Sequence, residues 1–252
     1  MPNAQTMNFD NIWVFIPAFN SAATLASTLK DLPPQITKII VVDDGSSDAT
    51  TKIATDYKVF VITHEKNRGY GAAQKSGYTF ALNKGAEIII MLHADYQYDS
   101  RVSLIMAELI LLGNCDLVLG NRIRTRREAL DGGMPFWRYS INRFSTFFEN
   151  IVLGQNLGDF HSGLRAYSSK ALKMIRFETN SDNFAFDQEL LVQACALNLR
   201  IGDIPIPVRY EKDSSSISVR QTLRYGNGAL RVLFLYFLHK FRIIRNSRFT
   251  SK

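Results

Sequence analysis

The chain has 252 residues, of which 46% are hydrophobic and 21% are charged, and this composition excludes a disordered or low-complexity protein. At about 150 residues per domain, the length predicts one large domain or two small ones. Lys and Arg exceed Asp and Glu by 30 − 23 = 7, which indicates an anionic partner: a phosphorylated substrate, a nucleic acid or an anionic membrane. Two cysteines, Cys115 and Cys195, are too few for a disulfide framework or a cysteine-based zinc site.

Neither a targeting segment nor a membrane span is expected from the sequence. The first residues contain no basic segment followed by an apolar core, which a signal peptide would have. A transmembrane helix needs about 20 mostly apolar residues. No stretch of the chain meets that requirement.

The N-terminal half alternates between short apolar runs, typical of buried strands, and helical patterns. Strands are expected at residues 12–16, 38–42, 59–62, 88–92 and 116–119. Helices are expected after Ser21, after the polar turn at 43–48, over 71–83 and from Ser100 to Leu112, with the two serines as caps. This alternation predicts an α/β fold, with a mostly parallel sheet and helices on both faces.

The C-terminal half follows a different pattern, which begins with four arginines within residues 122–127. A flexible loop is expected at 132–135, an amphipathic helix at 139–153, a loop and short strand at 158–166, a helix at 186–199 and an extended segment at 201–210. The sequence shows no internal repeat and no linker-like tract.

Three polar loops are expected to converge at one edge of the sheet, at residues 17–21, 43–46 and 93–97. Each follows a predicted strand, and ligands of such sheets bind outside the carboxyl ends of the strands. Asp43 and Asp44 could accept hydrogen bonds from a nucleotide base or a ribose hydroxyl. Because Asp also favours helix N-caps, a simple capping turn is the alternative.

The third loop contains His93, Asp95 and Gln97. Side chains two apart on an extended segment share one face, so these three could point at one ion or phosphate. The alternative is a strand-end Asp that only forms a turn. No other histidine has metal-ligand spacing to a neighbouring residue.

Several segments resemble, in order and spacing, the successive motifs of family 2 glycosyltransferases. These segments are 16–20, 41–48, 67–73 and 93–97. Three later segments, 120–122, 162–165 and 186–191, resemble the dolichol-phosphate-mannose synthase branch of that family. The resemblance covers roughly residues 12–217. It implies a GT-A type α/β sandwich and an inverting transfer of a sugar from a nucleotide-diphosphate sugar to a polyprenyl phosphate; the alternative acceptor is a hydroxyl of a glycan or glycolipid.

The resemblance also implies roles for individual residues. It implies that the nucleotide-binding residues are Pro17, Phe19, Asn20, Asp43, Asp44, Asn67 and Ala94. It implies that Asp95 and Gln97 hold a divalent metal, Mg²⁺ or Mn²⁺, on the donor diphosphate. The implied catalytic residues are Asp95, Arg122, Arg138, Asp187 and Glu189, and the implied acceptor-binding residues are Asn142, Ser162 and Arg165.

One departure from the family pattern concerns the metal. The acidic metal motif of the family usually reads Asp-x-Asp, and here His93 replaces its first Asp. Hard cations such as Mg²⁺ prefer oxygen ligands, whereas imidazole suits softer ions. We therefore expect weaker metal binding or a preference for Mn²⁺, with a supporting role for His93.

The acceptor is predicted from charge and from acid–base requirements. A hydroxyl acceptor needs a general base, whereas an ionised lipid phosphate needs cations to hold it. Either Asp187 or Glu189 could be a base; because they are two apart on a predicted helix and do not face each other, at most one is expected to point into the site. The chain has more arginines after the fifth predicted strand than a diphosphate alone requires. They are Arg122, Arg124, Arg138, Arg143 and Arg165. This surplus favours the phosphate acceptor.

The tail, residues 219–252, is expected to form a basic amphipathic helix separate from a catalytic domain at 1–218. On a helix, its arginines fall within an arc of about 60°: Arg220, Arg224, Arg231, Arg242 and Arg245. This pattern predicts peripheral attachment to the cytoplasmic face of a membrane. The alternative is a helix that packs in the core or against a second copy, and the oligomeric state stays open.

Two other functional classes fit the sequence less well. A nucleotidyltransferase typically has a glycine-rich, lysine-bearing first loop, and the loop at 17–20 has neither feature. No recognised nucleic-acid-binding motif accompanies the positive charge, so no nucleic-acid partner is expected.

Overall fold

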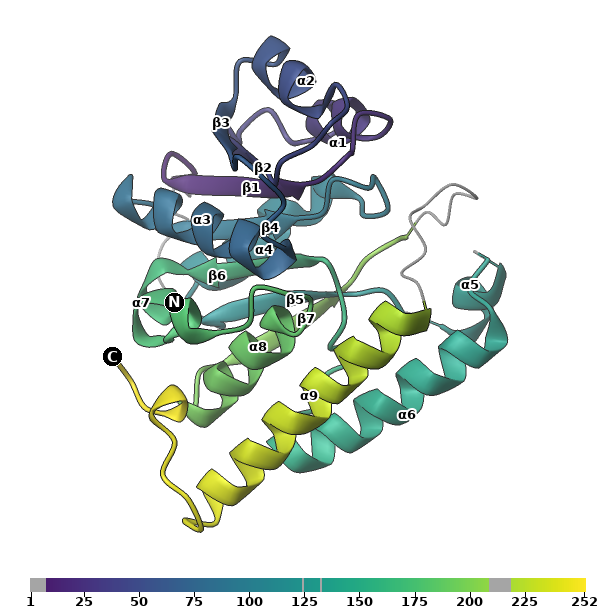
Figure 1. Cartoon of the computed structure of the whole chain (residues 1–252), viewed down its shortest axis with the longest axis vertical. Helices are drawn as coiled ribbons and strands as arrows, with labels where there is room; N and C mark the ends of the chain where they lie inside the picture. Colours follow the sequence, from purple (N-terminus) through teal and green to yellow (C-terminus); the bar gives the residue numbers. More distant parts are fainter. Residues whose placement is uncertain (1–7, 124, 132, 209–218) are drawn as a thin grey trace.

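The structure is a computed structural model that describes residues 8–123, 125–131, 133–208 and 219–252, with the side chains of the last range described from residue 226. Its strands form one sheet in the order β3-β2-β1-β4-β6-β5-β7 (Figure 1). They are β1 (Ile12–Ala18), β2 (Lys38–Asp43), β3 (Phe60–Thr63), β4 (Ile88–Leu92), β5 (Leu117–Asn121), β6 (Leu164–Ser168) and β7 (Ile201–Pro205). The four N-terminal strands pair in parallel, and β7 is parallel to β5, whereas β6 is antiparallel to both β4 and β5.

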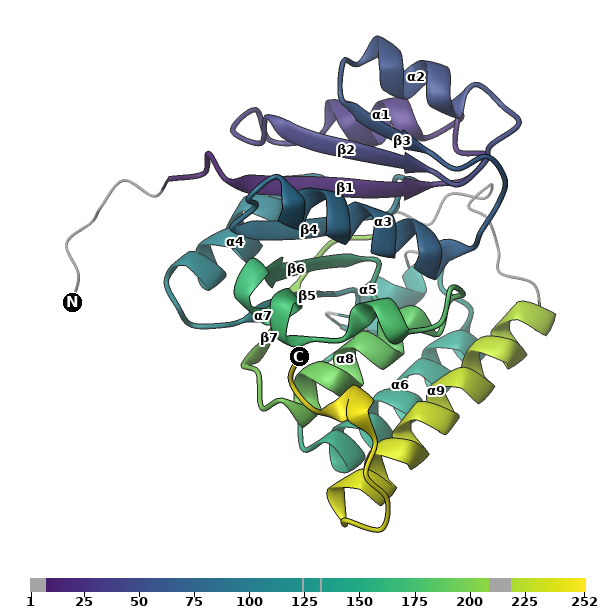
Figure 2. The ribbon, with the colours of Figure 1, turned by 60° about the vertical axis from the view of Figure 1, so that its left-hand side comes forward.

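The helices cover both faces of the sheet, as the alternating pattern predicts (Figures 1 and 2). The α-helices are α1 (Leu25–Lys30), α2 (Thr50–Asp56), α3 (Tyr70–Asn83), α4 (Ser103–Leu111), α5 (Arg126–Asp131), α6 (Phe136–Leu153), α7 (Ser169–Met174), α8 (Phe186–Ala196) and α9 (Val219–Lys240). Short 3₁₀ turns are η1 (Ser100–Val102), η2 (Phe177–Thr179) and η3 (Ser247–Phe249).

The sheet separates two hydrophobic cores, and β1 contributes to both because successive side chains of a strand point to opposite faces. Trp13 and Phe15 pack into the core shared with α3, α8 and α9. Val14 and Ile16 pack into the core shared with α1, α2 and α4. Burial on both faces explains why the central strands are continuous apolar runs. It also holds their carboxyl ends in fixed positions at one edge.

The two serine caps expected from the sequence are not formed. The first turn of α1 begins at Leu25, where the backbone carbonyl of Ser21 accepts the Leu25 amide, and no side chain caps the helix. Ser100 instead starts η1, and the capping side chain is Asp99, which accepts the Arg101 amide. In both places a turn precedes the helix, which shifts the helix start away from the serine.

The C-terminal segment packs on the rest of the fold. Val232, Leu233 and Tyr236 of α9 are buried in the core that α8 also lines. After α9 the chain turns back, and Phe249 is 3% exposed against Tyr236. The Arg176 guanidinium then donates to the carbonyls of residues 250 and 251. Figure 2 shows the C-terminus beside α7 and α8, so the boundary at 218 and 219 does not divide the core.

The arc of arginines expected along the tail is interrupted. The helix ends at Lys240, and Arg242 has a φ of 60°, which an α-helix does not allow. Arg242 and Arg245 therefore do not continue the helical arc. The side chains of Arg220 and Arg224 lie outside the described residues.

Helix α6 is amphipathic as expected, but its polar side faces the protein. Asn142, Thr146 and Glu149 lie on the inward side, where Glu149 Oε2 is 3.4 Å from Nε2 of His161. The opposite side exposes seven large apolar side chains, which we call the α6 apolar face: Phe136, Trp137, Ile141, Phe144, Phe147, Phe148 and Ile151. This arrangement reverses the usual pattern of a surface helix.

Helix α9 runs beside α6 (Figures 1 and 2). It adds three more exposed apolar side chains, and a fourth, Phe241, follows its last residue; the three are Leu230, Phe234 and Phe237. Within the described part of the chain, no helix is both long and apolar enough to cross a membrane.

Candidate active site

The first loop of the site follows β1. Phe19 is 49% exposed there, while Pro17 is buried within the strand. The Asn20 backbone has a positive φ of 50°, and its side-chain oxygen accepts the Ser47 amide at 2.9 Å. The Asn20 amide in turn donates to the Ser46 hydroxyl at 2.8 Å. Asn20 therefore joins the loops after β1 and β2, and leaves the Phe19 ring at the surface beside them.

The two carboxylates after β2 are buried and bonded to the protein. Asp43 accepts the Ser46 amide and the Thr51 hydroxyl. Asp44 accepts the backbone amides of Arg68 and Gly69 at 2.9 and 2.8 Å. Both carboxylates thus hold the loops at this edge of the sheet in place, and their direct contact with a nucleotide stays a prediction.

The loop held by Asp44 carries Asn67, which is exposed. His64 Nδ1 lies 2.6 Å from Asp44 Oδ1, which fixes the other end of this loop. Gly45 has a φ of +76°, and a Cβ there would lie 2.6 Å from the Lys66 backbone, so only glycine allows this approach. The sequence did not reveal the role of His64, because its partner lies 20 residues away.

The third loop follows β4 and contains the expected metal ligands. Asp95 Oδ1 accepts the Gln97 amide at 3.1 Å, and Oδ2 lies 3.8 Å from His93 Nδ1. The hydrogen bond from the Gln97 amide stabilises the ionised form of the Asp95 carboxylate. The preceding residue, Ala94, is buried, and its carbonyl accepts the Thr24 hydroxyl at 2.7 Å.

A divalent cation fits this donor set if it arrives with a diphosphate. Among the described residues, no group of three or more His, Cys, Asp and Glu could hold a metal alone. Mg²⁺ is commonly bound by one or two carboxylates together with substrate phosphates. Asp95, with the neighbouring Gln97 side chain, supplies that partial set at the edge of the sheet where a ligand would bind.

Asp187, one of the two candidate bases, accepts hydrogen bonds from helix α3. The Tyr70 hydroxyl donates to its Oδ2 at 2.8 Å, and Gln74 Nε2 donates to its Oδ1 at 2.7 Å. The Arg165 guanidinium is 3.9 Å from the same carboxylate. Burial and the charge of Asp187 raise the pKa of Tyr70 well above its usual value, so its hydroxyl stays protonated. Sequence reasoning missed both partners on α3, because they lie more than 110 residues from Asp187.

Arg165 is enclosed by the protein. Its side chain is 1% exposed and donates to the carbonyls of Ser162, Phe160 and Asp187. Ser162 is equally buried. As the structure stands, neither residue reaches an acceptor at the surface, and Arg165 instead orients Asp187.

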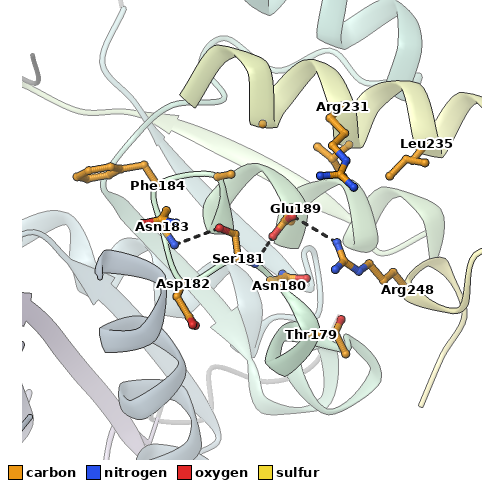
Figure 3. Close-up of a pocket in the computed structure, with 13 residues that line it drawn as sticks. Thr179, Asn180, Ser181, Asp182, Asn183, Phe184, Glu189, Arg231, Leu235 and Arg248 are labelled. Atoms are coloured by element: carbon orange, nitrogen blue, oxygen red, sulfur yellow. Dashed lines mark hydrogen bonds and ion pairs between the residues drawn. The ribbon is translucent and has the colours of Figure 1, made fainter. Parts of the chain in front are cut away.

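Glu189, the other candidate base, faces a different pocket. Figure 3 shows its carboxylate turned toward Ser181 and Arg248, in a cavity of about 710 Å³ between α8 and α9. Oε2 accepts the Ser181 amide, and Oε1 lies 3.4 Å from Nη1 of Arg248. Asp187 and Glu189 thus point to different places, as expected for residues two apart on a helix.

Arg122 and Asn142, which the sequence analysis assigned to catalysis and to the acceptor, meet at a buried ion pair. Arg122 Nε donates to Oδ2 of Asp159 at 2.6 Å, and Asp159 is fully buried. Asn142 of α6 donates to the other oxygen at 3.2 Å. Arg143, also from α6, donates to the carbonyl of residue 158 at 2.7 Å. The middle of α6 is thereby joined to the loop between α6 and β6, and Asp159 of that loop also contacts Arg122, which follows β5.

The remaining arginines differ in exposure. Arg138 is exposed at the start of α6, and its guanidinium lies 5.2 Å from the Trp137 ring. Arg124 lies outside the described residues. The cationic surplus counted from the sequence is therefore smaller at the surface, because Arg165 is internal and Arg122 is paired with Asp159.

Replacing Asp159 by Asn should lower the free energy of unfolding by about 3–5 kcal/mol at pH 7, because it leaves the Arg122 charge without its carboxylate. Burial raises the pKa of Asp159, but Arg122 outweighs it and holds the pKa far below its usual value. The carboxylate therefore stabilises the fold fully above the unfolded pKa of about 3.9, and this contribution is lost as the pH falls below it.

Urea denaturation of both proteins between pH 7 and pH 3 measures this effect. The difference between them should shrink below about pH 4. Asp131→Asn is the control, since that side chain is 69% exposed in a surface pair. A difference for Asp159→Asn that is as small as that of the control would contradict the prediction.

Comparison with known proteins places the chain among sugar-transferring enzymes. It is 34% identical to an uncharacterized protein of Methanocaldococcus jannaschii, over 83% of this chain and 86% of the other. It is 29% identical to the UDP-N-acetylglucosamine–dolichyl-phosphate N-acetylglucosaminyltransferase of Methanococcus voltae, over 81% and 87% of the two chains.

The fold resembles that of glucosyl-3-phosphoglycerate synthase from Mycobacterium tuberculosis, solved with Mn²⁺, UDP-glucose and phosphoglyceric acid. The TM-score is 0.67 at 19% identity, over 90% of this chain and 79% of that one. The likeness confirms the expected GT-A type α/β sandwich. Residues 13–176 match the family described as Glycosyl transferase family 2. With that match over most of its length, the chain belongs to glycosyl transferase family 2 and is a glycosyltransferase.

Proposed function

We propose that this glycosyltransferase moves a sugar from a nucleoside-diphosphate sugar to a polyprenyl phosphate at a membrane surface. The observation that carries the acceptor is the two-sided character of α6: the α6 apolar face points outward, while the inward side contacts the ion pair of Arg122 and Asp159 through Asn142. A cluster of large apolar side chains exposed together commonly marks an interaction site. An isoprenoid phosphate suits this helix, because its chain is apolar and its anionic phosphate can meet Arg138, which lies 5.2 Å from the Trp137 ring of the α6 apolar face.

The donor end of the proposal rests on the edge of β1, β2 and β4. The exposed Phe19 ring offers a surface for the base, and Asp95 and Gln97 offer oxygens for a cation on the diphosphate. The M. voltae relative is named for a UDP-sugar donor, and the mycobacterial synthase was solved with UDP-glucose and Mn²⁺. A bound divalent cation would neutralise the charge that grows on the leaving diphosphate.

The reaction forms a bond between an acceptor phosphate oxygen and the anomeric carbon, while the bond from that carbon to the diphosphate oxygen breaks. An ionised phosphate needs no base, so neither Asp187 nor Glu189 has to remove a proton. This agrees with their contacts, because Asp187 accepts two internal hydrogen bonds and Glu189 faces another pocket. We propose that Arg138 and Arg122 hold phosphate oxygens on the acceptor side.

Attachment to the membrane is proposed through α6 and α9 together. Their exposed Phe, Trp, Leu and Ile side chains would enter the boundary between headgroups and acyl chains. Arg138 is exposed beside Trp137 of the α6 apolar face and suits anionic headgroups. The sequence pointed to the tail alone. We expect α6 to be the larger contributor, because it exposes seven large apolar side chains and the described part of α9 exposes three.

Phe144 and Phe147 provide the test of this attachment, since they are 74% and 64% exposed. Burial of each ring contributes about 1.5–3 kcal/mol, so the double variant Phe144→Ser with Phe147→Ser should bind anionic vesicles at least about 100-fold more weakly. Vesicle sedimentation measures the binding. Ile105→Ser with Leu112→Ser, at similarly exposed positions of α4 and its end, should bind as the unmodified protein does.

A transfer assay completes the test. The protein should transfer label from a nucleotide sugar to undecaprenyl or dolichyl phosphate in vesicles, and the α6 double variant should lose this activity while keeping nucleotide binding. Equal vesicle binding by the two double variants, or transfer to glycan hydroxyls instead of the lipid phosphate, would contradict the proposal.

A further inference from the structure

The imidazole of His93 is held in one orientation from several sides. Its Nε2 lies 2.6 Å from the Tyr70 hydroxyl, and the rings of Tyr70 and Tyr98 meet it edge-on. Gly163 lies against the ring, since a Cβ there would be 2.3 Å from both Nδ1 and Cε1 and 2.5 Å from Cγ. The similar distances to three ring atoms put the glycine over the face of the ring. The glycine does not cover the edge of the ring that carries Nδ1, and this edge faces Asp95.

The donors and acceptors around Tyr70 determine which tautomer this imidazole adopts. The Tyr70 hydroxyl has one proton, and it donates that proton to the carboxylate of Asp187 at 2.8 Å. A carboxylate accepts only, so the proton cannot also point at His93. The 2.6 Å contact to His93 must therefore run from the Nε2–H of the imidazole to the Tyr70 oxygen. In the neutral ring, Nδ1 then has the lone pair.

That lone pair faces Asp95 across a gap which suits a cation. Nδ1 and Asp95 Oδ2 are 3.8 Å apart, too far for a hydrogen bond. Two metal–ligand bonds of about 2.1 Å each can span such a separation. Both side chains are about one-quarter exposed, at 28% and 26%, so the gap is open to a cation and its diphosphate. A lone pair beside a carboxylate is otherwise unfavourable, and a cation between them would remove the repulsion.

We propose that His93 is a ligand, through Nδ1, of the divalent cation that Asp95 holds, and that Tyr70 is the positioning residue that fixes this nitrogen. The proposal deepens the proposed glycosyl transfer and rests on its donor site. A ligating histidine commonly donates its other N–H to a partner that fixes its orientation, and here the partner is Tyr70, itself anchored by Asp187.

A nitrogen ligand changes which cation the site prefers. Imidazole suits transition ions, whereas Mg²⁺ favours carboxylate, carbonyl and water oxygens. The replacement of an acidic residue by His93 is then a change of selectivity toward Mn²⁺, supported by Tyr70 and Gly163, rather than a weakened copy of an oxygen site. This interpretation differs from the supporting role that the sequence suggested for His93.

Pulsed electron paramagnetic resonance of Mn²⁺ tests the proposal without measuring turnover. Mn²⁺ bound to the unmodified protein with UDP, or in parallel with GDP, should show coupling to a directly bound nitrogen. Protein prepared with ¹⁵N-histidine should shift this coupling to the ¹⁵N frequency, which assigns it to a histidine. His93→Asp should abolish the coupling and move the ratio of Mn²⁺ to Mg²⁺ affinity toward Mg²⁺ by at least about tenfold.

The tyrosine is tested separately by calorimetry of Mn²⁺ binding in the presence of the same nucleotides. Tyr70→Phe should weaken Mn²⁺ about 10–100-fold and leave Mg²⁺ much less affected, because it removes the support of the nitrogen only. Tyr57→Phe, which removes a hydroxyl from a ring that is 43% exposed, is the control.

The two proposals can fail separately. Nucleotide-dependent Mn²⁺ binding without histidine coupling would overturn the role of His93 and leave the proposed transfer in place. If no nucleoside diphosphate promotes binding of either cation, both the ligand assignment and the donor site are wrong. Because ¹⁵N labelling needs no substitution, the outcome does not depend on whether His93→Asp folds.

Discussion

Replacing Asp95 by alanine should lower metal-dependent glycosyl transfer by at least about 10³-fold, because stabilisation of transition-state charge by a cation contributes several kcal/mol. The fold should be unchanged. The side chain lies in a loop, is 26% exposed, and its short-range protein contact is the Gln97 amide. Calorimetry should show that Mn²⁺ no longer strengthens the binding of UDP or GDP, while the melting temperature stays near that of the unmodified protein.

The matched control is Asp56→Ala, which removes an exposed carboxylate at the end of α2. It should keep both turnover and Mn²⁺-dependent binding. Unchanged Mn²⁺-dependent nucleotide affinity in Asp95→Ala would show that the cation is held elsewhere, and the assignment of the third loop would be wrong.

Arg138→Ala should lower turnover about 10²–10³-fold without loss of stability, if this arginine holds phosphate oxygens in the transition state. The position is informative because Arg138 is exposed. Arg122→Ala should cost at least as much, but it also leaves the buried Asp159 unpaired, so its effect on folding must be measured alongside. Arg127→Ala, at a side chain 91% exposed on α5, is the control and should retain full activity.

Variants of Asp187 and Glu189 test whether the acceptor is a phosphate or a hydroxyl. With a phosphate acceptor, Glu189→Gln and Asp187→Asn should each keep substantial turnover. Asp187→Asn requires a parallel melting measurement, because Asp187 accepts bonds from Tyr70 and Gln74 and lies beside the buried Arg165. A carboxamide variant that is folded, binds the donor and is inactive would identify a general base and thus a hydroxyl acceptor.

The strands and the loops that follow them could be predicted from the sequence because their signals are local. An apolar run such as 38–42 indicates a strand buried on both faces, and parallel strands bring their carboxyl ends to one edge. These local signals correctly predicted the strand at 88–92 and the loop after it, which contains Asp95. They could not assign hydrogen-bond partners, and so they gave no sign that Asp44 holds the backbone at Arg68 and Gly69.

What the sequence could not predict depends on contacts between distant segments. By sequence, Arg165 is among the arginines available to bind phosphate, yet its side chain is buried beside Asp187. The amphipathic pattern of α6 was visible, but periodicity does not tell which side of a helix faces the protein. Similarly, the return of the tail onto Arg176 requires a turn at Arg242 that composition does not indicate.

The placement of α6 also bears on how an insoluble acceptor could be used. The helix that would lie in the bilayer surface is the same one whose Asn142 and Arg143 bond to the loop beneath it. Under the proposed function, the reaction centre is therefore held at a constant height above the lipid. The isoprenoid chain can stay dissolved among the acyl chains while its phosphate alone rises to meet the sugar, and no step has to extract the whole molecule into water.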